Sequence, residues 1–538
     1  MAAPDLTSLP TQVSPPEFAL SALRPHALRG VEVVAVPVLP NDGDRSDGDD
    51  AAGGGVLLGP GGAELAEELD VDLLAVLEDV KASGKTGEVT SLPVPTGSPT
   101  NPDLRLVLLV GVGGRSTTDL RRAGAALARA VRGRASVATS VPAVGGEDVL
   151  GAFVVGAMLA GFTFELRSAP PENPPVGRVV LAAQPDSPTL VDALERAVAV
   201  GGAGWRARTL ATVPSNIKNP AWLADQAVAV ADEVGLDATV WDADRLRAAG
   251  FGGIVGVGQA SATPPCLIRL DYKPSRSAKG AAKGTTKGGR KAPRVVLVGK
   301  GITFDTGGLS IKPAEAMTNM KRDMTGGAVV IAVMGALAAV DCPVRVTGLV
   351  AAAENAVSGN ALRPGDVVRH YGGRTSEVTN TDAEGRLVMA DALAYATEEL
   401  DPAVIVDVAT LTGAMKVALG QQVGGYFAND EELARVLREA GGTSGEPLWR
   451  FPLAADYEEL LESKVADADN APGGPGAITA ALFLQHFVGS TPWAHLDIAS
   501  VGDAPADRDE WTTGPTGFGA RLLLEWLGGD DPLAGIGA

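Results

Sequence analysis

Two Gly-rich segments of the chain concentrate the residue types that could do metal chemistry. Residues 298–327 read VGKGITFDTGGLSIKPAEAMTNMKRDMTGG, and residues 380–387 read NTDAEGRL. They supply carboxylates at Asp305, Asp323, Asp382 and Glu384. If these groups share one pocket, cations must lie among them, because a buried unpaired charge is strongly unfavourable. Two divalent ions match their charge, and hard oxygen ligands suit Zn²⁺, Mn²⁺ or Mg²⁺.

The spacing of these residues fits a shared site. Asp382 and Glu384 are two positions apart, so on an extended segment both side chains can face the same way. The apolar run RVVLVGK predicts a buried strand over residues 294–300 that ends at Lys300, with Asp305 after a short turn. Functional groups often lie where a rigid strand meets a loop. Taken singly, each residue also fits a solvated turn acid or a surface lysine.

The two segments resemble the signature motifs of the leucine aminopeptidase family, the cytosolic dinuclear-metal exopeptidases. NTDAEGRL is similar to the central octapeptide of that family, and GKGITFDTGGLSIK follows its other main motif. The likeness covers residues 210–525 well and the first 190 residues weakly. It continues through four further segments, ENAVSGNALRPGD (354–366), ATLTGA (409–414), GAITAALFL (476–484) and WAHLDIA (493–499). The presence of all these segments in the order found in the family therefore favours a functional site over a set of solvated surface residues.

The resemblance implies roles for individual residues. The implied metal ligands are Lys300, Asp305, Asp323, Asp382 and Glu384. The implied catalytic pair is Lys312 and Arg386, and a weaker transfer places Met320, Thr410 and Gly413 in the pocket for the first substrate residue. Such a lining predicts a preference for Leu or Met at the substrate N-terminus. An ammonium has no lone pair, so as a ligand Lys300 must be neutral, and desolvation and nearby cations both favour that form.

The family likeness also implies an activity. We expect a hydrolase that releases N-terminal amino acids, preferentially Leu or other apolar residues, from peptides by attack of metal-activated water on the first peptide carbonyl. Lys312 would polarise that carbonyl, and Arg386 would hold a bicarbonate that acts as general base. The implied cofactors are two divalent ions per subunit, Mn²⁺ or Zn²⁺, with Mg²⁺ as an alternative. The implied assembly is a homohexamer with the sites facing an interior cavity.

Composition bounds the class of protein. A chain of 538 residues exceeds the usual size of one domain, so we expect two domains of unequal size. The net charge of −20 argues against broad binding to nucleic acid or to anionic membranes. Two cysteines exclude a disulfide framework, and the N-terminal residues show no basic segment followed by an apolar run. We therefore expect a cytoplasmic protein without membrane spans.

The N-terminal part, residues 1–200, alternates predicted strands and helices, which is typical of an α/β layer with a parallel or mixed sheet. Apolar runs predict strands at 31–39, 104–114 and 176–183, and three-and-four spacing predicts helices at 63–80 and 118–131. The resemblance implies a macro-like fold for this smaller domain. Gly111, Gly113 and Gly114 do not form a dinucleotide fingerprint, because Ser116 replaces its third glycine.

For the rest of the sequence we expect a linker at 201–220 and a larger α/β catalytic domain at 221–538 with a mixed central sheet. A helix is expected to start at Pro220. Further strands are expected at 266–272, 344–353 and 403–411, and helices at 325–340 and 387–400. The N-terminus of the last helix lies beside Asp382 and Glu384, where backbone N–H groups favour anions.

Two low-complexity segments predict surface loops. The acidic, Gly-rich tract at 42–55 predicts a flexible loop, and the Lys/Gly/Ala-rich segment at 273–293 predicts a disordered insert between neighbouring strands. The basic insert is the only support for an alternative role in binding nucleic acid, which the net charge opposes. A catalytically silent scaffold is a further alternative, and the presence of all seven expected ligand and catalytic residues argues against it.

Overall fold

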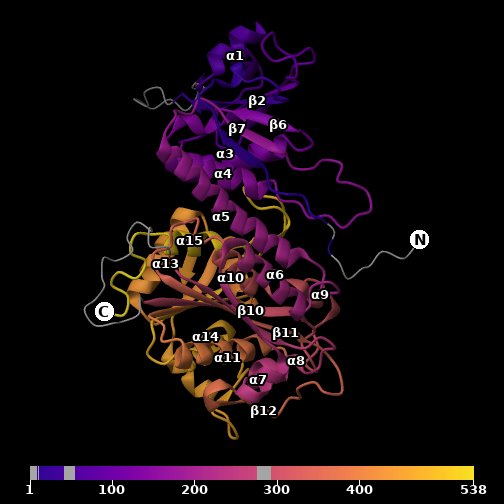
Figure 1. The fold of residues 1–538 in the computed structure, drawn as a ribbon, viewed down its shortest axis with the longest axis vertical. Helices are drawn as coiled ribbons and strands as arrows, with labels where there is room; N and C mark the ends of the chain where they lie inside the picture. The colour runs from indigo at the N-terminus through magenta and orange to yellow at the C-terminus, as the bar shows by residue number, and fades with distance from the viewer. Residues whose placement is uncertain (1–8, 10, 42–54, 275–292) are drawn as a thin grey trace. The chain divides into compact units, whose positions relative to one another are not determined.

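The computed structural model describes residue 9 and residues 11–41, 55–274 and 293–538. The chain forms two compact units. The smaller contains Pro10–Trp205 and Ala506–Thr513, and the larger contains Arg206–Pro505 and Gly514–Ala538. Both units are built from α/β layers around mixed sheets (Figure 1), as expected from the sequence. The expected linker at 201–220 is helical as far as Thr212, and a helix starts at Pro220 as predicted.

The smaller unit is built on a seven-stranded sheet of order β1-β7-β6-β2-β5-β4, with β3 paired to β2. Its strands are β1 Glu17–Leu20, β2 Val33–Pro40, β3 Val56–Leu58, β4 Val89–Pro93, β5 Leu106–Gly111, β6 Ser136–Thr139 and β7 Arg178–Leu181. Its helices include α1 Gly62–Leu69, α2 Leu73–Asp79, α3 Thr117–Ala130 and α4 Glu147–Ala160, with η1 Pro25–Ala27 and η2 Val141–Val144 as 3₁₀ turns. Helix α5, Pro188–Thr212, ends in the larger unit.

One helix prediction for this unit is wrong. The apolar spacing over 63–80 predicted a single helix, but Asp70 adopts a left-handed conformation with φ 52° and ends α1, so α2 is separate. The predicted strands at 31–39, 104–114 and 176–183 are confirmed as β2, β5 and β7. The tract at 42–55 lies, apart from Gly55, outside the described residues.

The larger unit contains an eight-stranded mixed sheet of order β16-β15-β18-β14-β10-β11-β9-β8. Its strands are β8 Asp237–Trp241, β9 Cys266–Tyr272, β10 Arg294–Asp305, β11 Arg345–Asn355, β14 Val404–Ala409, β15 Gly424–Ala428, β16 Leu448–Arg450 and β18 Trp493–Asp497. Strand β10 runs parallel to both β11 and β14, and β14 runs parallel to β18. Short strands complete the unit, β12 Asp366–Arg369, β13 Thr375–Val378, β17 Ala468–Asp469, β19 Asp503–Ala504 and β20 Gly514–Pro515.

Helices cover both faces of this sheet, with α10 on one side of β10 and α11 and α14 on the other (Figure 1). The helices are α6 Pro220–Val234, α7 Ala243–Ala249, α8 Gly252–Gly258, α9 Ala314–Met317, α10 Thr325–Met334, α11 Glu384–Glu399, α12 Gly413–Leu419, α13 Glu431–Ser444, α14 Gly476–Gln485 and α15 Ala520–Leu527. The 3₁₀ turns are η3 Met320–Arg322, η4 Tyr371–Gly373 and η5 Ala455–Leu461. Alternate β10 residues Val296, Val298 and Ile302 belong to the apolar core that includes α11 and α14.

Three expectations near the motifs need correction. Strand β10 does not end at Lys300 but continues to Asp305, so no turn separates the two residues. Residues 382–384 are not an extended segment, because Glu384 is the first residue of α11. Helix α10 ends at Met334, before the predicted end at 340. The insert at 273–293 lies, apart from its terminal residues, outside the described part of the chain.

No helix within the described ranges is long and apolar enough to cross a membrane.

Helix α10 lies against the sheet at a distance that only glycine permits, which gives a first prediction. A Cβ atom on Gly326 would lie 2.0 Å from the carbonyl oxygen of Val408, so Gly326→Ala must displace backbone. We expect the variant to lower the free energy of unfolding by about 1–3 kcal/mol, as overpacking does, measured as a lower midpoint of thermal or urea unfolding.

The matched control is Gly442→Ala in α13, where an added Cβ meets nothing within 4 Å. Alanine is the better helix former, so this variant should gain about 0.5–1 kcal/mol. Equal midpoints for the two variants would contradict the close packing of α10.

Candidate active site

The candidate residues converge where the parallel strands of the larger unit end. Asp305 is the last residue of β10, Asn355 is the last residue of β11, and Thr410 follows β14 directly. The N-terminus of α11 brings Glu384 to the same edge. The carboxyl ends of parallel strands are the usual place for a binding crevice in α/β sheets, because the loops that follow them can vary without disturbing the sheet.

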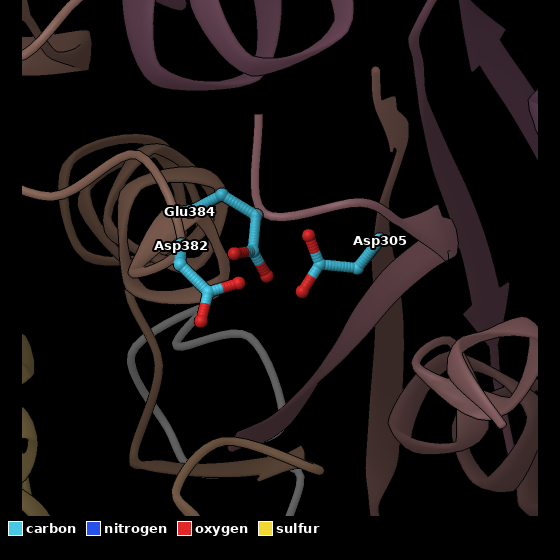
Figure 2. Close-up of side chains that lie close together, drawn as sticks. All are labelled: Asp305, Asp382 and Glu384. Carbon is cyan, nitrogen blue, oxygen red and sulfur yellow. The ribbon is translucent and has the colours of Figure 1, made fainter. Parts of the chain in front are cut away.

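Three of the predicted carboxylates point toward one another (Figure 2). Asp305, Asp382 and Glu384 each offer an oxygen atom, and these oxygens lie within 4.8 Å of one another. Asp305 and Glu384 are buried and Asp382 is half-buried. Within the described structure, Glu384 Oε2 is buried without a hydrogen-bond partner. A buried acidic cluster with an unused oxygen has the chemistry of a site for hard cations.

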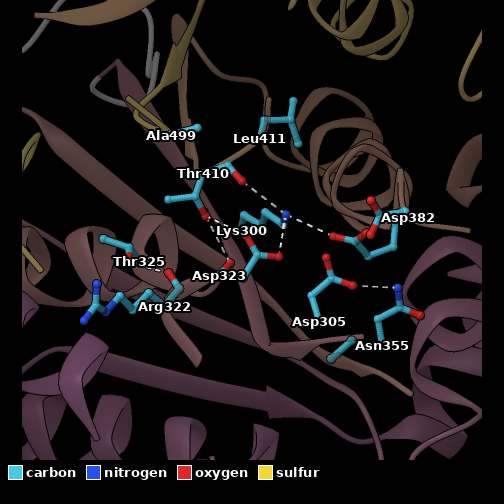
Figure 3. Close-up of polar contacts among 12 residues, drawn as sticks. Lys300, Asp305, Arg322, Asp323, Thr325, Asn355, Asp382, Thr410, Leu411 and Ala499 are labelled. Carbon is cyan, nitrogen blue, oxygen red and sulfur yellow. Dashed lines mark hydrogen bonds and ion pairs between the residues drawn. The ribbon is translucent and has the colours of Figure 1, made fainter. Parts of the chain in front are cut away.

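Lys300 joins the fourth carboxylate to this cluster (Figure 3). Its Nζ lies 2.7 Å from Asp323 Oδ2 and 3.0 Å from Glu384 Oε1. It also donates a hydrogen bond of 3.3 Å to the carbonyl of Thr410. Burial disfavours the charged amine, but Asp323 and Glu384 outweigh that effect and raise the pKa of Lys300 above its usual value. In this arrangement Lys300 is an ammonium; the neutral, ligating form stays a prediction.

Lys312 pairs with the other two carboxylates. It lies in the loop between β10 and α9, and its Nζ is 2.8 Å from Asp305 Oδ2 and also forms an ion pair with Asp382. Burial opposes the charge here too, and Asp305 contributes most to raising the pKa of Lys312 above its usual value. Each lysine therefore bridges two carboxylates.

The pKa values of the carboxyl groups reflect their burial and their mutual repulsion. Burial raises the pKa of Asp323 and of Glu384 above the ordinary values, and the nearby charge of Asp305 adds to the shift of both. Burial also raises the pKa of Asp382. Carboxylates that are this reluctant to ionise together gain strongly from divalent cations, because the cations remove the repulsion that causes the shifts.

A cavity of about 310 Å³ opens beside the cluster. Lys300, Asp382, Glu384 and Arg386 contribute to its lining. Burial lowers the pKa of Arg386 to about 10. Among the described atoms, its Nε has no hydrogen-bond partner, so the guanidinium retains a donor for an anion.

The three residues expected at the substrate pocket have different positions. Gly413 begins α12 and lines the cavity. The hydroxyl of Thr410 donates a hydrogen bond of 2.8 Å to Asp323 Oδ1, so it holds a carboxylate in place. Met320 begins η3, the turn that precedes Asp323, and neither Met320 nor Thr410 belongs to the residues lining this cavity.

The sequence analysis did not single out Asn355 and Thr381, whose hydrogen bonds connect residues of the site. The side-chain amide of Asn355 donates to Asp305 Oδ1 at 2.8 Å and to the carbonyl of Thr381 at 3.0 Å. The hydroxyl of Thr381 donates to the carbonyl of Gly307 at 2.6 Å. These bonds connect the two motif segments across the site. The available signal was a polar residue at the end of a predicted apolar strand, inside the segment 354–366.

Comparison with known proteins matches this chain along both units. Residues 205–524 match the model of the cytosol aminopeptidase family, catalytic domain, and residues 53–168 match the model of its N-terminal domain. A probable cytosol aminopeptidase of Desulfovibrio desulfuricans is 43% identical over 467 residues, which cover 84% of this chain and 89% of that protein. One from Streptomyces avermitilis is 40% identical over 526 residues, which cover 94% and 96%.

Solved structures agree with these matches. The bottromycin maturation enzyme BotP in complex with Mn has a TM-score of 0.77 and 34% identity, and the match covers 93% of this chain and 99% of that one. A mutant of tomato leucine aminopeptidase has a TM-score of 0.80 and 31% identity, with 96% and 98% covered. Together with the acidic cluster at the carboxyl edge of the sheet, these matches show that the chain belongs to the cytosol aminopeptidase family and is a metal-dependent aminopeptidase, a hydrolase.

Proposed function

We propose that this aminopeptidase releases N-terminal residues from peptides, with a preference for Leu and other apolar residues, at the carboxyl edge of β10. The observation that carries the proposal is the convergence of Asp305, Asp382 and Glu384 beside two basic side chains, Lys312 and Arg386. Acidic oxygens bind divalent cations, and the basic groups can stabilise the negative charge that develops when a carbonyl is attacked. The cavity beside the cluster leaves room for a substrate.

The proposed metal site uses residues that the structure brings together. Asp305, Asp323, Asp382, Glu384 and a deprotonated Lys300 would hold two divalent ions, Mn²⁺ or Zn²⁺, with Mg²⁺ as an alternative. The Mn bound by the similar BotP supports the first choice. Such ions, when bound, supply Lewis acidity and lower the pKa of a coordinated water. The unused Glu384 Oε2 and the crowded, buried carboxylates fit this group.

Lys312 and Arg386 would act on the substrate. The two carboxylates that hold the Lys312 ammonium also fix its position at the cluster, from which it would donate a hydrogen bond to the carbonyl oxygen of the scissile peptide. Arg386 lines the cavity and retains an unused Nε–H, so it would bind bicarbonate, which would take the proton released during attack.

Specificity, assembly and location are also proposals. Gly413 lines the cavity and would shape the pocket for an apolar first residue. Met320, in the turn before Asp323, and Thr410, which is hydrogen-bonded to Asp323, would contribute to the same pocket. The homohexamer rests on the family resemblance, and the cytoplasmic location rests on that resemblance together with the composition of the chain.

The metal assignment is tested by removing one ligand at a time. Asp323→Ala and Glu384→Ala should each lower the bound metal and abolish turnover of a leucine amide, because each removes a ligand and leaves a buried charge uncompensated. Metal content by mass spectrometry and initial rates give the result. Asp232→Ala, at an exposed position of α6, is the control and should behave like the parent. Full metal content and a near-normal rate in either ligand variant would refute the assignment.

The role of Lys312 separates chemistry from metal binding. Lys312→Ala should lower kcat by about 100- to 1,000-fold, the usual loss for one donor to a developing oxyanion, while the metal content stays unchanged. Arg386→Ala should lower kcat less, and added bicarbonate should stimulate this variant less than the parent. Loss of metal from Lys312→Ala would show instead that the lysine serves the ions.

A further prediction concerns Asn355, which holds the proposed ligand Asp305 by a hydrogen bond. Asn355→Ala removes the donors to Asp305 and to the Thr381 carbonyl, so metal affinity or activity should fall by about 10- to 100-fold. Asn360→Ala, in the exposed turn that follows β11, is the matched control. Titration of the metal-free proteins with Mn²⁺, followed by rates, makes the measurement. Parent-like affinity in Asn355→Ala would show that Asp305 does not depend on this bond.

A further inference from the structure

A buried amine outside the motifs lies next to the turn that carries Asp323. Lys218 occupies the segment between α5 and α6, and its side chain is 0% exposed. Its contacts with described residues include no carboxylate. Burial, with the charge of Lys321 as the next contribution, lowers the pKa of Lys218 well below its usual value. Burying a lysine without a carboxylate partner costs free energy, so its position requires an explanation.

The hydrogen bonds of Lys218 show how the charge is held. Its Nζ donates to the carbonyls of Leu210 at 2.9 Å, Ala211 at 3.0 Å and Lys321 at 2.6 Å. Three carbonyl acceptors match the three N–H groups of an ammonium, whereas a neutral amine has two, so the hydrogen bonds favour the charged form and oppose the effect of burial on the pKa. Leu210 and Ala211 lie in the last turn of α5, whose carbonyls lack partners within the helix and carry partial negative charge. The helix end takes the place of a counter-ion.

The third bond extends this support to the site. Lys321 belongs to η3, and Asp323 follows η3 directly. Nζ of Lys218 also contacts Met324 Sδ at 3.2 Å, so the amine contacts residues on both sides of Asp323 in the sequence. Asp323 in turn lies 2.7 Å from Lys300. Lys321 reinforces the junction, because its own Nζ donates to the carbonyl of Thr212 at 2.9 Å.

We propose that Lys218 is a positioning residue that fixes the Asp323 carboxylate by tying its turn to the C-terminal end of α5. This inference rests on the proposed role of Asp323 as a metal ligand. Without the ammonium, the carbonyls of Leu210, Ala211 and Lys321 lose their donor inside the protein, and the turn must move to recover hydrogen bonds. Asp323 would then bind its metal ion more weakly.

The experiment compares Lys218→Met, which has no donor, with Lys218→Gln, which keeps an amide donor. Equilibrium dialysis of the metal-free full-length variants against Mn²⁺ measures both binding steps. We expect Lys218→Met to bind one of two Mn²⁺ about 10- to 100-fold more weakly than the parent, as when an outer-sphere partner of a ligand is lost. Lys218→Gln should be intermediate. The rise in Tm caused by Mn²⁺ should shrink in the same order.

A control separates positioning from general loss of stability. Leu437→Ala, on the buried side of α13, leaves a cavity in a helix that carries none of the site residues, so it should lower Tm while the Mn²⁺ affinity stays unchanged. At saturating Mn²⁺, Lys218→Met should recover kcat toward the parent with an unchanged KM for a leucine amide.

The outcomes distinguish this inference from the function on which it rests. Parent-like Mn²⁺ affinity in Lys218→Met, together with weak binding in Asp323→Ala, overturns the role of Lys218 alone. Parent-like affinity in Asp323→Ala overturns the ligand assignment itself. If Lys218→Met does not fold, Lys218→Gln decides: weaker Mn²⁺ binding supports the proposal, and parent-like binding overturns it.

Discussion

Repulsion among buried carboxylates is the constraint on which the arrangement of the larger unit depends. The sheet brings Asp305 to the end of β10, and α11 brings Glu384 against it, so the backbone places the two acidic groups close together. Stability then requires positive charge between them. Lys300 and Lys312 supply it by bridging one carboxylate pair each, and divalent ions in the same cluster would supply more.

Close packing makes this concentration of charge possible. Gly385, in the first turn of α11, has no Cβ, and a Cβ there would lie 2.5 Å from Cε of Lys300. Gly326 plays the same part on the opposite side of the sheet, where α10 approaches the Val408 carbonyl. The glycines thus let one helix on each face approach the strands that carry the site, and the helix N-terminus of α11 adds its own favourable potential for an anion. The electrostatics of the site depend on these contacts.

The sequence predicted most of the elements and the residues that meet at the edge, because apolar runs and motif likeness are local signals. It misplaced the end of β10 since a lysine inside an apolar strand normally ends the pattern; here Lys300 is tolerated because two carboxylates flank it. It placed the start of α11 too late because Gly385 disfavours a helix, a cost that its approach to Lys300 explains. Asn355 was missed because its partners come from distant segments.

Two buried lysines in the described part of the chain, Lys300 and Lys218, are held by different means, and the difference follows from the demands of the site. Lys300 is balanced by carboxylates, which suits a position where positive charge and metal ions share the same oxygens. A carboxylate beside Lys218 would place another acid next to the turn of Asp323 and would compete for the cations that the cluster needs. The carbonyls of Leu210 and Ala211 offer partial negative charge that is fixed in the backbone and cannot take up a proton. A helix end can therefore hold an ammonium near an acidic site without making the site more acidic.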